Sequence, residues 1–175
     1  MDEIVDVLDE QTGKRTGETI SKNEAHEKGI CHGAINILII NNDKTKILLQ
    51  KRCKEKKLYP NTWDISVGGH ISSGEEALVS AKRELEEELG LNPNNYNFEF
   101  IEVIKEELNN NGIDSKEFLH TYLIKSDIDL SLIKIQKEEV SEVKWFTKEE
   151  LKNLIIENKV IPHVKTYEII NNILI

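Results

Sequence analysis

Glutamates crowd the segment "RELEEELGL", residues 83–91, at spacings that bring several of them together on a helix. At 100° per residue, Glu84, Glu87 and Glu88 share a face about 100° wide. Like charges at such spacings repel by about 0.2–0.5 kcal/mol per pair, and a divalent cation would turn this repulsion into coordination. Carboxylate oxygens suit Mg²⁺, Mn²⁺ and Ca²⁺, and protein-bound Mg²⁺ commonly bridges to substrate phosphates. The segment therefore predicts a metal site for a phosphorylated substrate.

An apolar stripe adjoins this carboxylate face. Leu78, Ala81, Leu85 and Leu89 recur at helical spacing, and we expect them to pack against a sheet. The three carboxylates would then lie at the border of the buried face, while Glu86 points elsewhere into solvent. The alternative is a solvated acidic helix with a purely structural role, because runs of charge commonly mark exposed faces.

The rest of the chain supplies strands more often than helices, and these elements must position the carboxylates. Their order, with helices spread along the chain, indicates an α/β sandwich with a mixed sheet and not a doubly wound parallel one. Apolar runs bounded by turn residues predict strands, and capped segments with helical spacing predict helices. Strands are expected in residues 3–9, 34–40, 46–52, 96–108, 116–126 and 141–146. Two further short strands are expected, one after the turn at residues 10–17 and one just before Gly68. Helices are expected in residues 21–29, in the glutamate segment, and in residues 147–159 and 163–174.

Capping residues mark the expected helix ends. Ser73, with Glu76 three residues later, forms a capping box for the glutamate helix, and Gly90 suits its C-terminal end. Thr147 and Glu150 form a second capping box for the helix that follows them. We therefore expect the glutamate helix to begin directly after Ser73.

Length and charge limit the classes of function. The chain has 175 residues, which favours one domain, and we expect residues 1–30 to form a β-hairpin and short helix packed on this single 1–175 domain. A net charge of −9 leaves no broad basic surface, so we expect no nucleic-acid polymer as a partner. A small anionic molecule is a suitable partner where cations offset the acidic groups.

Cysteine content and hydropathy predict a cytoplasmic location. Cys31 and Cys53 are two cysteines in a chain of 175 residues, which is typical of reduced thiols. The acidic start "MDEIVDVLDE" lacks an apolar signal segment, and the run "INILII" is far shorter than the roughly 20 residues that span a bilayer. We expect no membrane partner, and a homodimer through the N-terminal hairpin and the "INILII" strand stays open.

The motif around the glutamates resembles that of a known family. Gly69 is followed by five residues, Glu75, seven residues and then "RELEEELGL". This resembles the Nudix box, G-x5-E-x7-R-E-U-x-E-E-x-G-U with U a bulky apolar residue, and all nine specified positions agree. The resemblance implies a Nudix-type α/β/α sandwich in which the box forms a loop–helix–loop catalytic motif. It also implies hydrolysis of a diphosphate linked to another group, with Mg²⁺ or Mn²⁺ as cofactor.

The resemblance further implies which groups hold the metal. Glu87 and Glu88 would be the principal ligands, with Glu84 a third ligand or the base that takes the proton of the attacking water. The carbonyl of Gly68, directly before the box, would be a backbone ligand.

Other roles follow from the same resemblance. Arg83 would orient Glu84 and pair with Glu75. A further glutamate outside the box often serves as base or ligand in relatives. Glu139 is the first candidate here, with Glu138 and Glu117 behind it, and surface carboxylates are the alternative reading of all three.

Stretches outside the box resemble one branch of the family, the hydrolases similar to isopentenyl-diphosphate isomerase. The shared features are His32 at the start of a strand, the basic pair Lys51-Arg52, Pro60 with Trp63, and Gly69-His70. Isomerases also need a cysteine where this chain has Gly68, and a pair of glutamates where it has Ser115 and Glu117. These departures and the intact box favour hydrolysis over isomerisation.

Several residues of this branch are candidate ligands of metal or substrate. His32 and His70 are either isomerase-type metal ligands or, as we expect, structural or substrate-facing side chains. Lys51 and Arg52 are candidates for binding terminal phosphates, and His70 and Glu117 are further candidates for contacting the substrate. The alternative for the basic pair is a solvated strand end.

Together these features predict a Mg²⁺-dependent Nudix hydrolase that cleaves a diphosphate linkage in a nucleoside diphosphate derivative or similar small organic diphosphate. The alternatives are an isopentenyl-diphosphate isomerase and a non-catalytic diphosphate-binding module. The substrate stays open among nucleoside diphosphate derivatives, dinucleotides and isoprenoid diphosphates, because specificity in this fold depends on loops outside the box.

Overall fold

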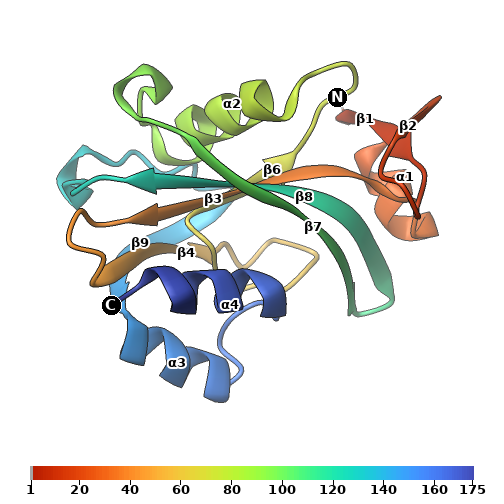
Figure 1. Cartoon of the computed structure of the whole chain (residues 1–175). Helices are drawn as coiled ribbons and strands as arrows, with labels where there is room; N and C mark the ends of the chain where they lie inside the picture. The colour runs from red at the N-terminus through yellow and green to blue at the C-terminus, as the bar shows by residue number, and fades with distance from the viewer. Residues whose placement is uncertain (1) are drawn as a thin grey trace.

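A nine-residue strand, β3 (His32–Ile40), runs through the centre of the protein, and all of its residues are buried (Figure 1). The computed structural model describes residues 2–175. β3 pairs in parallel with β8 (Ile113–Lys125) and antiparallel with β4 (Lys46–Arg52) and β6 (Val67–His70). A strand that is covered on both faces needs apolar side chains on both sides, which explains its near-continuous apolar sequence.

The outer strands complete a mixed sheet. β7 (Glu99–Asn110) pairs antiparallel with β8 through a tight turn in which Asn111 and Gly112 both have positive φ, as a type I′ hairpin requires. β4 also pairs with β9 (Val140–Thr147) and with the two-residue strand β5 (Trp63–Asp64). The loop between β4 and β5 carries the basic sequence "CKEKK".

A hairpin and a short helix precede β3. β1 (Ile4–Leu8) and β2 (Arg15–Ser21) pair antiparallel, and we call these strands with their connecting turn the N-terminal hairpin. α1 (Lys22–Lys28) follows directly. Its first turn is capped by the Ser21 side chain, and it ends at Gly29 in a left-handed conformation. This short helix holds His26 beside the end of the sheet.

Helices cover both faces of the sheet (Figure 1). α2 (Ala77–Leu89) packs on one face, where Ala81, Leu85 and Leu89 are fully buried in a core shared with β3. α3 (Lys148–Ile156) and α4 (Val164–Ile173) contribute to a second core on the opposite face. Short 3₁₀ helices at Pro93–Asn95 and Leu130–Leu132 lie in the connections. The predicted α/β sandwich with a mixed sheet is confirmed.

The start of α2 differs from the sequence prediction. The helix begins at Ala77, with Glu76 as its N-cap residue, so the capping box predicted at Ser73 does not form. The Ser73 hydroxyl donates instead to the carboxylate of Asp6 in the N-terminal hairpin, at 2.7 Å. Competition from a distant carboxylate has therefore moved the helix start beyond the residue that local sequence favours.

The other predicted helix ends agree better with the structure. Gly90 adopts a left-handed conformation with φ of 65° and ends α2, and Thr147 with Glu150 forms the capping box of α3. Leu78, which we expected in the apolar stripe of α2, is 39% exposed. The buried stripe therefore begins one turn later, at Ala81.

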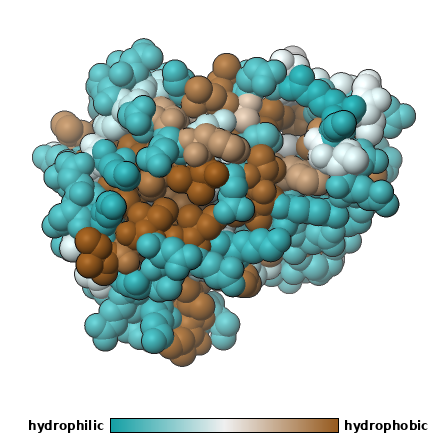
Figure 2. All heavy atoms as spheres, in the orientation of Figure 1, coloured by the Kyte–Doolittle hydropathy of each residue, from teal (hydrophilic) through white to brown (hydrophobic). Residues whose placement is uncertain are grey.

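The surface is mainly polar, but apolar side chains gather over β7 and α4 on the face shown in Figure 2. Phe100 and Val103 of β7 are among the exposed apolar residues, at 54% and 41% exposure. Within residues 2–175, no helix combines the length and the apolar character needed to cross a membrane.

Candidate active site

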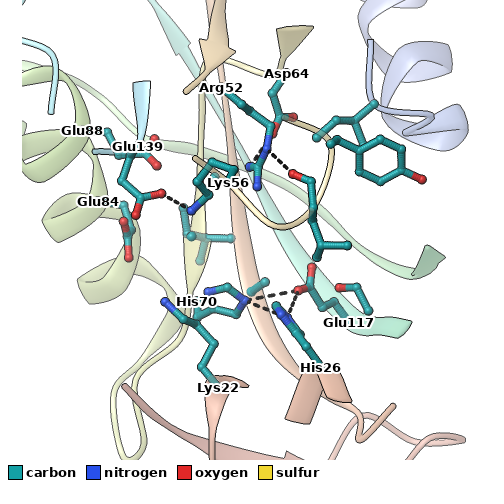
Figure 3. Close-up of a pocket in the computed structure, with 18 of the residues that line it drawn as sticks. Lys22, His26, Arg52, Lys56, Asp64, His70, Glu84, Glu88, Glu117 and Glu139 are labelled. Atoms are coloured by element: carbon teal, nitrogen blue, oxygen red, sulfur yellow. Dashed lines mark hydrogen bonds and ion pairs between the residues drawn. The ribbon is translucent and has the colours of Figure 1, made fainter. Parts of the chain in front are cut away.

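A cavity of about 670 Å³ lies beside the carboxylate face of α2 (Figure 3). Glu84, Glu88 and Glu139 lie on one side of it. Arg52 of β4, Lys56 of the basic loop, His70 of β6 and His26 of α1 lie across from them. A cavity of this size accommodates a nucleotide-sized molecule. Its acidic wall includes Glu84, Glu87, Glu88, Glu138 and Glu139, and its basic side chains are Lys22, Arg52, Lys56, Lys57 and Arg83.

The three glutamates that were predicted to share a helical face all line this cavity. Glu84 and Glu88 are 8% and 5% exposed, whereas the Glu87 side chain is 50% exposed. Gln50 Nε2 donates to Glu88 Oε2 at 2.8 Å, which fixes one carboxylate oxygen. Glu86 is exposed and lies outside the lining. The alternative of a fully solvated acidic helix is therefore wrong, because two of the carboxylates are buried.

Burial changes the ionisation of the two inner carboxyl groups. It raises the pKa of Glu84 to about 7, although the neighbouring Arg83 guanidinium acts in the opposite direction. Burial, and then the charge of Glu84, raises the pKa of Glu88 well above its usual range. Carboxylates with so little compensation take up either a proton or a cation, and oxygen donors suit a hard divalent cation. The donor set therefore fits the metal that the sequence predicts.

Arg83 lies between the carboxylates of the box. Its Nη1 donates to Glu84 Oε1 at 2.6 Å and to Glu87 Oε2 at 3.2 Å. Its Nε lies 3.6 Å from Glu75 Oε2, which also accepts a hydrogen bond from Ser80. One guanidinium thus fixes the relative positions of three box glutamates.

The backbone on the other side of Arg83 is equally constrained. Nη2 donates to the His70 carbonyl at 3.1 Å and lies 3.2 Å from the Ser72 hydroxyl. A Cβ at Gly69 would lie 2.2 Å from the carboxyl carbon of Glu84. Glycine at this position therefore allows the carboxylate to approach β6, where Gly68 also lines the cavity.

Glu139, the first candidate for a functional glutamate outside the box, lies in the same cavity (Figure 3). Its carboxylate forms an ion pair with the Lys56 ammonium of the basic loop. After burial and the charge of Glu84, the charge of Glu139 also raises the pKa of Glu88, which reflects their proximity. Glu138 lines the cavity as well.

The basic pair at the end of β4 divides between two faces of the sheet. Arg52 lines the cavity, where its Nε donates to the Leu58 carbonyl at 3.0 Å and its Nη1 lies 3.4 Å from Asp64 Oδ2. Lys51 lies outside the lining, with its ammonium 5.9 Å from the centroid of the Trp63 ring. Successive strand residues point to opposite faces, so of the predicted pair only Arg52 lines the cavity.

A histidine cluster, made of His26, His32, His70 and Glu117, adjoins the carboxylate wall (Figure 3). One potential ligand atom of each residue lies within 4.8 Å of the others. Nε2 atoms of His26, His32 and His70 lie 3.5, 3.3 and 3.3 Å from Glu117 Oε1. Glu117, which sequence reasoning placed among the substrate candidates, is therefore the centre of a nitrogen-rich site.

The donor atoms of the cluster suit a metal ion. His32 Nδ1 lies 2.9 Å from the Ile30 carbonyl, so an Nδ1–H donor there turns Nε2 toward Glu117. Burial alone would lower the pKa of His32, but contact with the Glu117 carboxylate outweighs burial and raises it, and a metal ion would take the place of the Nε2 proton. Within residues 2–175, that buried Nε2 has no hydrogen-bond partner of normal geometry. Burial alone would raise the pKa of Glu117, but hydrogen bonds from the histidines hold it well below its usual range. An imidazole–carboxylate donor set fits a divalent transition metal.

Comparison with known proteins identifies the family. The NUDIX domain matches residues 32–166 of this chain. The chain belongs to the Nudix family. It is an enzyme of the Nudix pyrophosphohydrolase type, which acts on small molecules and generally uses a divalent metal. The pattern of residues 69–91 is therefore its Nudix box.

Relatives of this Nudix enzyme include hydrolases and isomerases. Nudix hydrolase 3 of Arabidopsis thaliana is 39% identical over 158 residues, which cover 88% of this chain and 20% of the relative's own length. An uncharacterized Nudix hydrolase of Listeria monocytogenes is 33% identical and covers 95% of this chain and 92% of its own. An isopentenyl-diphosphate delta-isomerase of Gibberella zeae is 32% identical over 87% of this chain and 66% of its own length. The crystal structure of DR0079 from Deinococcus radiodurans has the same fold, with a TM-score of 0.76 at 20% identity over 98% of this chain and 99% of its own.

A second group of buried charges, of which Asp64 and His163 line the cavity, lies outside the Nudix box of this enzyme. His163, directly before α4, places Nε2 3.0 Å from Asp64 Oδ1 and Nδ1 2.6 Å from Glu106 Oε2. Burial alone would lower the pKa of His163, but these two hydrogen bonds raise it to about 10. The pKa of Asp64 is lowered, because its contacts with His163 and Arg52 outweigh burial. We call Asp64, Glu106 and His163 the buried triad.

Sequence reasoning missed His26 and the buried triad. His26 belongs to a seven-residue helix and meets His70 across 44 residues of sequence, while Asp64 meets His163 across 99. The local spacing of residues cannot predict contacts between residues so far apart in the sequence. One signal was available for Asp64, since a carboxylate inside the apolar stretch "WDISV" is rarely buried without a partner.

Proposed function

We propose that this protein is a Mg²⁺-dependent Nudix hydrolase that cleaves a diphosphate linkage in a nucleoside diphosphate derivative or a similar small organic diphosphate. The observation that carries the proposal is the meeting of buried carboxylates and basic side chains in one cavity. On one wall, the buried carboxyl groups of Glu84 and Glu88 would bind a cation. On another wall, the positively charged Arg52 and Lys56 would bind an anion. A diphosphate that arrives with a divalent cation satisfies both walls.

Glu87 and Glu88 are the proposed principal metal ligands, together with the carbonyl of Gly68. Bound Mg²⁺ or Mn²⁺ would screen the phosphate charge and lower the pKa of a water molecule. Gln50 holds Glu88 in one orientation through its 2.8 Å hydrogen bond. Glu87 is half exposed, so this ligand is accessible from solvent before substrate enters.

Glu84 and Glu139 are the two candidates for the base that accepts the proton of the attacking water. The pKa of Glu84 is about 7, near the value that general-base catalysis favours, and Arg83 holds its carboxylate at 2.6 Å. Glu139 is engaged by Lys56 and must leave this ion pair before it accepts a proton. We therefore place Glu84 first, as the base or a third metal ligand, and Glu139 second.

The substrate phosphates are proposed to bind Arg52 and Lys56. Both line the cavity across from the Nudix box. Arg52 is held by the Leu58 carbonyl, and a guanidinium fixed in this way is prepared for bidentate contact with a phosphate. His70 and Glu117 face the same cavity from the histidine cluster.

A product-release screen tests the proposal, with chromatography to detect the phosphomonoesters that cleavage of a diphosphate linkage releases. The panel contains nucleoside diphosphate derivatives, dinucleotides and isoprenoid diphosphates, each with Mg²⁺ and with Mn²⁺. We expect metal-dependent release from at least one class, with loss of release in Glu87→Gln. Glu86→Gln is the matched control, because Glu86 is exposed on the same helix and lies outside the cavity lining. Binding of a diphosphate without any metal-dependent release would identify a binding module and reject the proposal.

The histidine cluster favours a second candidate function, isopentenyl-diphosphate isomerisation, because His32 and His70 lie together in a candidate metal site and an isopentenyl-diphosphate delta-isomerase is among the relatives. Gly68 stands where that chemistry needs a thiol, and Cys31 and Cys53 are buried outside the cavity lining. We therefore place hydrolysis first. Incubation with isopentenyl diphosphate and Mg²⁺ separates the two, since formation of dimethylallyl diphosphate would reverse this order.

We also propose that the histidine cluster holds a transition-metal ion. The unpartnered His32 Nε2 and the ionised Glu117 supply the fitting observation. Titration of metal-free protein with Zn²⁺ or Mn²⁺ tests it. His26→Gln should weaken binding by about a hundredfold, because it removes one direct ligand and even residues that only support a ligand change metal affinity by about 10- to 100-fold. His120→Gln is the control, because His120 lies on β8 outside the cluster. Equal affinities in the two variants would reject this metal site.

A further inference from the structure

The loop of the Nudix box that precedes α2 is held by the N-terminal hairpin. The Ser73 N–H donates to the Ile4 carbonyl at 2.8 Å, and Ser72 forms an isolated β-bridge with Val5. Asp6 accepts from the Ser73 hydroxyl at 2.7 Å and from the Gly74 N–H at 3.0 Å. The Asp6 carboxylate thus accepts hydrogen bonds from two consecutive residues of the loop.

Arg15 adds further contacts, both to Asp6 and to the loop. Arg15 Nε lies 3.0 Å from Asp6 Oδ2, and Arg15 Nη2 donates to the Glu75 carbonyl at 2.5 Å. Because Arg15 belongs to β2 and Asp6 to β1, the two strands of the hairpin bind the loop together. The last residue that they hold, Glu75, is a specified position of the Nudix box.

A second contact reaches Arg83 itself. Glu3 Oε1 accepts from the Ser72 hydroxyl at 2.8 Å and lies 3.6 Å from Arg83 Nη2. Ser72 is in turn 3.2 Å from the same Arg83 nitrogen. The guanidinium that orients Glu84 is therefore braced on its other side by a residue of the N-terminal segment.

The loop needs such support, because its own residues supply little. Ser73 and Gly74 are exposed, and Gly74 has a φ of 79° with no atom within 4 Å of the position a Cβ would take. Within the described residues, the Glu76 side chain makes no capping hydrogen bond to α2. The match to the NUDIX domain begins at residue 32, so the supporting residues lie outside the matched region.

We propose that Asp6 and Glu3 are positioning residues of the active site: Asp6 fixes the Nudix-box loop at Ser73 and Gly74, and Glu3 steadies Arg83, so that Glu84 is correctly placed. The inference rests on the proposed function, because it assigns the two residues to the hydrolytic site. Neither residue needs to touch the substrate. Their effect passes through the loop and the guanidinium.

Point variants of the full chain test this role. Asp6→Ala removes the carboxylate that accepts the hydrogen bonds from Ser73 and Gly74, and Asp6→Asn keeps a weaker acceptor of the same size. Asp9→Ala is the matched control, because Asp9 accepts three hydrogen bonds within the turn of the same hairpin and none from the box loop. Ser73→Ala removes one partner of Asp6 from the loop side and leaves the hairpin sequence unchanged. Glu3→Gln tests the contact with Arg83.

Hydrogen exchange of the Gly74 amide gives a measurement that is independent of activity. We expect exchange to be about tenfold faster in Asp6→Ala, with a smaller change in Asp6→Asn, because a charge-assisted hydrogen bond is lost. In the same variant the kcat should fall about tenfold while KM changes less than about twofold, since transition-state placement and not binding is disturbed. Asp9→Ala should change neither quantity.

The remaining variants separate the two contacts. Ser73→Ala should lower kcat by about threefold and add nothing to Asp6→Ala in the double variant, because both changes remove the same hydrogen bond. Glu3→Gln should lower kcat by about threefold and leave Gly74 exchange unchanged.

Equal kcat in Asp6→Ala and Asp9→Ala, or unchanged Gly74 exchange, would overturn the inference. If the wild-type protein hydrolyses no diphosphate, the proposed function fails. The Mn²⁺ affinity of the box then replaces kcat, with a loss in Asp6→Ala alone supporting the positioning role and equal affinities overturning it.

Discussion

Two groups of buried charge meet at the same cavity, and they differ in how far neighbouring charges compensate the cost of burial. Burial raises the pKa of Glu84 to about 7 despite its contact with Arg83, and it raises the pKa of Glu88, which has a neutral Gln50 as its hydrogen-bond partner, well above the usual range. In the buried triad, His163 lies between Asp64 and Glu106, and its pKa rises to about 10. A buried charge with partners contributes to one stable structure, whereas a buried charge without them is available to a ligand.

The histidine cluster lies between these two cases. Its carboxylate, Glu117, faces three imidazoles, yet His32 Nε2 has no hydrogen-bond partner within residues 2–175. Part of the cluster is therefore self-compensated and part is open to a cation. The Nudix-box carboxylates, the histidine cluster and the buried triad thus differ in how fully neighbouring charges balance their own. We expect the better balanced groups to stabilise the fold and the less balanced ones to bind ligands.

The largest expected effect separates function from stability at the Nudix box. Glu88→Gln should reduce turnover by about a thousandfold, because it removes a proposed metal ligand. The same change should leave the free energy of unfolding of the metal-free protein unchanged or higher, because a poorly compensated carboxyl group is replaced by a neutral amide of similar size. Steady-state kinetics and denaturant unfolding measure the two quantities.

Glu86→Gln provides the control for this prediction. Glu86 lies two residues away on the same helix but is exposed. Its replacement should change neither turnover nor stability appreciably. A large loss of stability in Glu88→Gln would show that this carboxylate serves the fold and would remove the contrast with the buried triad.

The buried triad should respond in the opposite way. His163→Gln should lower the free energy of unfolding by about 3 kcal/mol, because it removes the cation that lies between Asp64 and Glu106 and leaves Asp64 with Arg52 alone, at 3.4 Å. Turnover per folded molecule should change by less than about fivefold, since His163 holds no proposed metal ligand. Urea unfolding and active-site-normalised kinetics give the comparison. A variant with wild-type stability and greatly reduced turnover would make His163 a catalytic residue.

The sequence predicted the Nudix-box carboxylates but not the buried triad. The carboxylate face of α2 was predictable because Glu84, Glu87 and Glu88 lie within two helical turns, so spacing alone sets their geometry. The buried triad depends on contacts across 57 and 99 residues, which no local spacing encodes. His26 reaches the histidine cluster in the same way, through the placement of α1.

Local rules also failed where a distant group competed with them. Ser73 and Glu76 satisfy the capping pattern, but Asp6 takes the Ser73 hydroxyl and α2 begins at Ala77. Lys51 and Arg52 are adjacent in sequence, but strand geometry sends one to Trp63 and the other into the cavity. The direction in which each side chain leaves the strand, and not its charge, decides which of the two lines the cavity.

The pH dependence of stability sharpens the contrast further. The pKa of His163 is raised from the ordinary value of 6.5 to about 10, so its ion pairs contribute fully below pH 6.5. This contribution is lost as the pH rises toward 10. The unfolding free energy of the wild-type protein should therefore decline by roughly 1 kcal/mol per pH unit across the upper part of this range. The decline should be absent in His163→Gln, and an identical decline in both proteins would assign it to other groups.

The smallest predicted effect concerns the basic strand end. Arg52→Met should raise KM by about tenfold, because Arg52 faces the cavity as a proposed phosphate ligand. Lys51→Met should change KM by less than about twofold, since Lys51 lies outside the lining. Steady-state kinetics on both variants with the same diphosphate substrate make the comparison. Equal effects would place the phosphate site elsewhere in the cavity.

The thermal unfolding midpoint with and without Mg²⁺ tests the central claim most directly, because it reports metal binding at the box without requiring the substrate. At a Mg²⁺ concentration about a hundredfold above Kd, the midpoint of the wild-type protein should rise by about 5 °C. His26→Gln should show the same rise, and Glu88→Gln should show little or none. No rise in the wild-type protein, or an equal rise in Glu88→Gln, would contradict the proposal that the carboxylates of the Nudix box form the metal site.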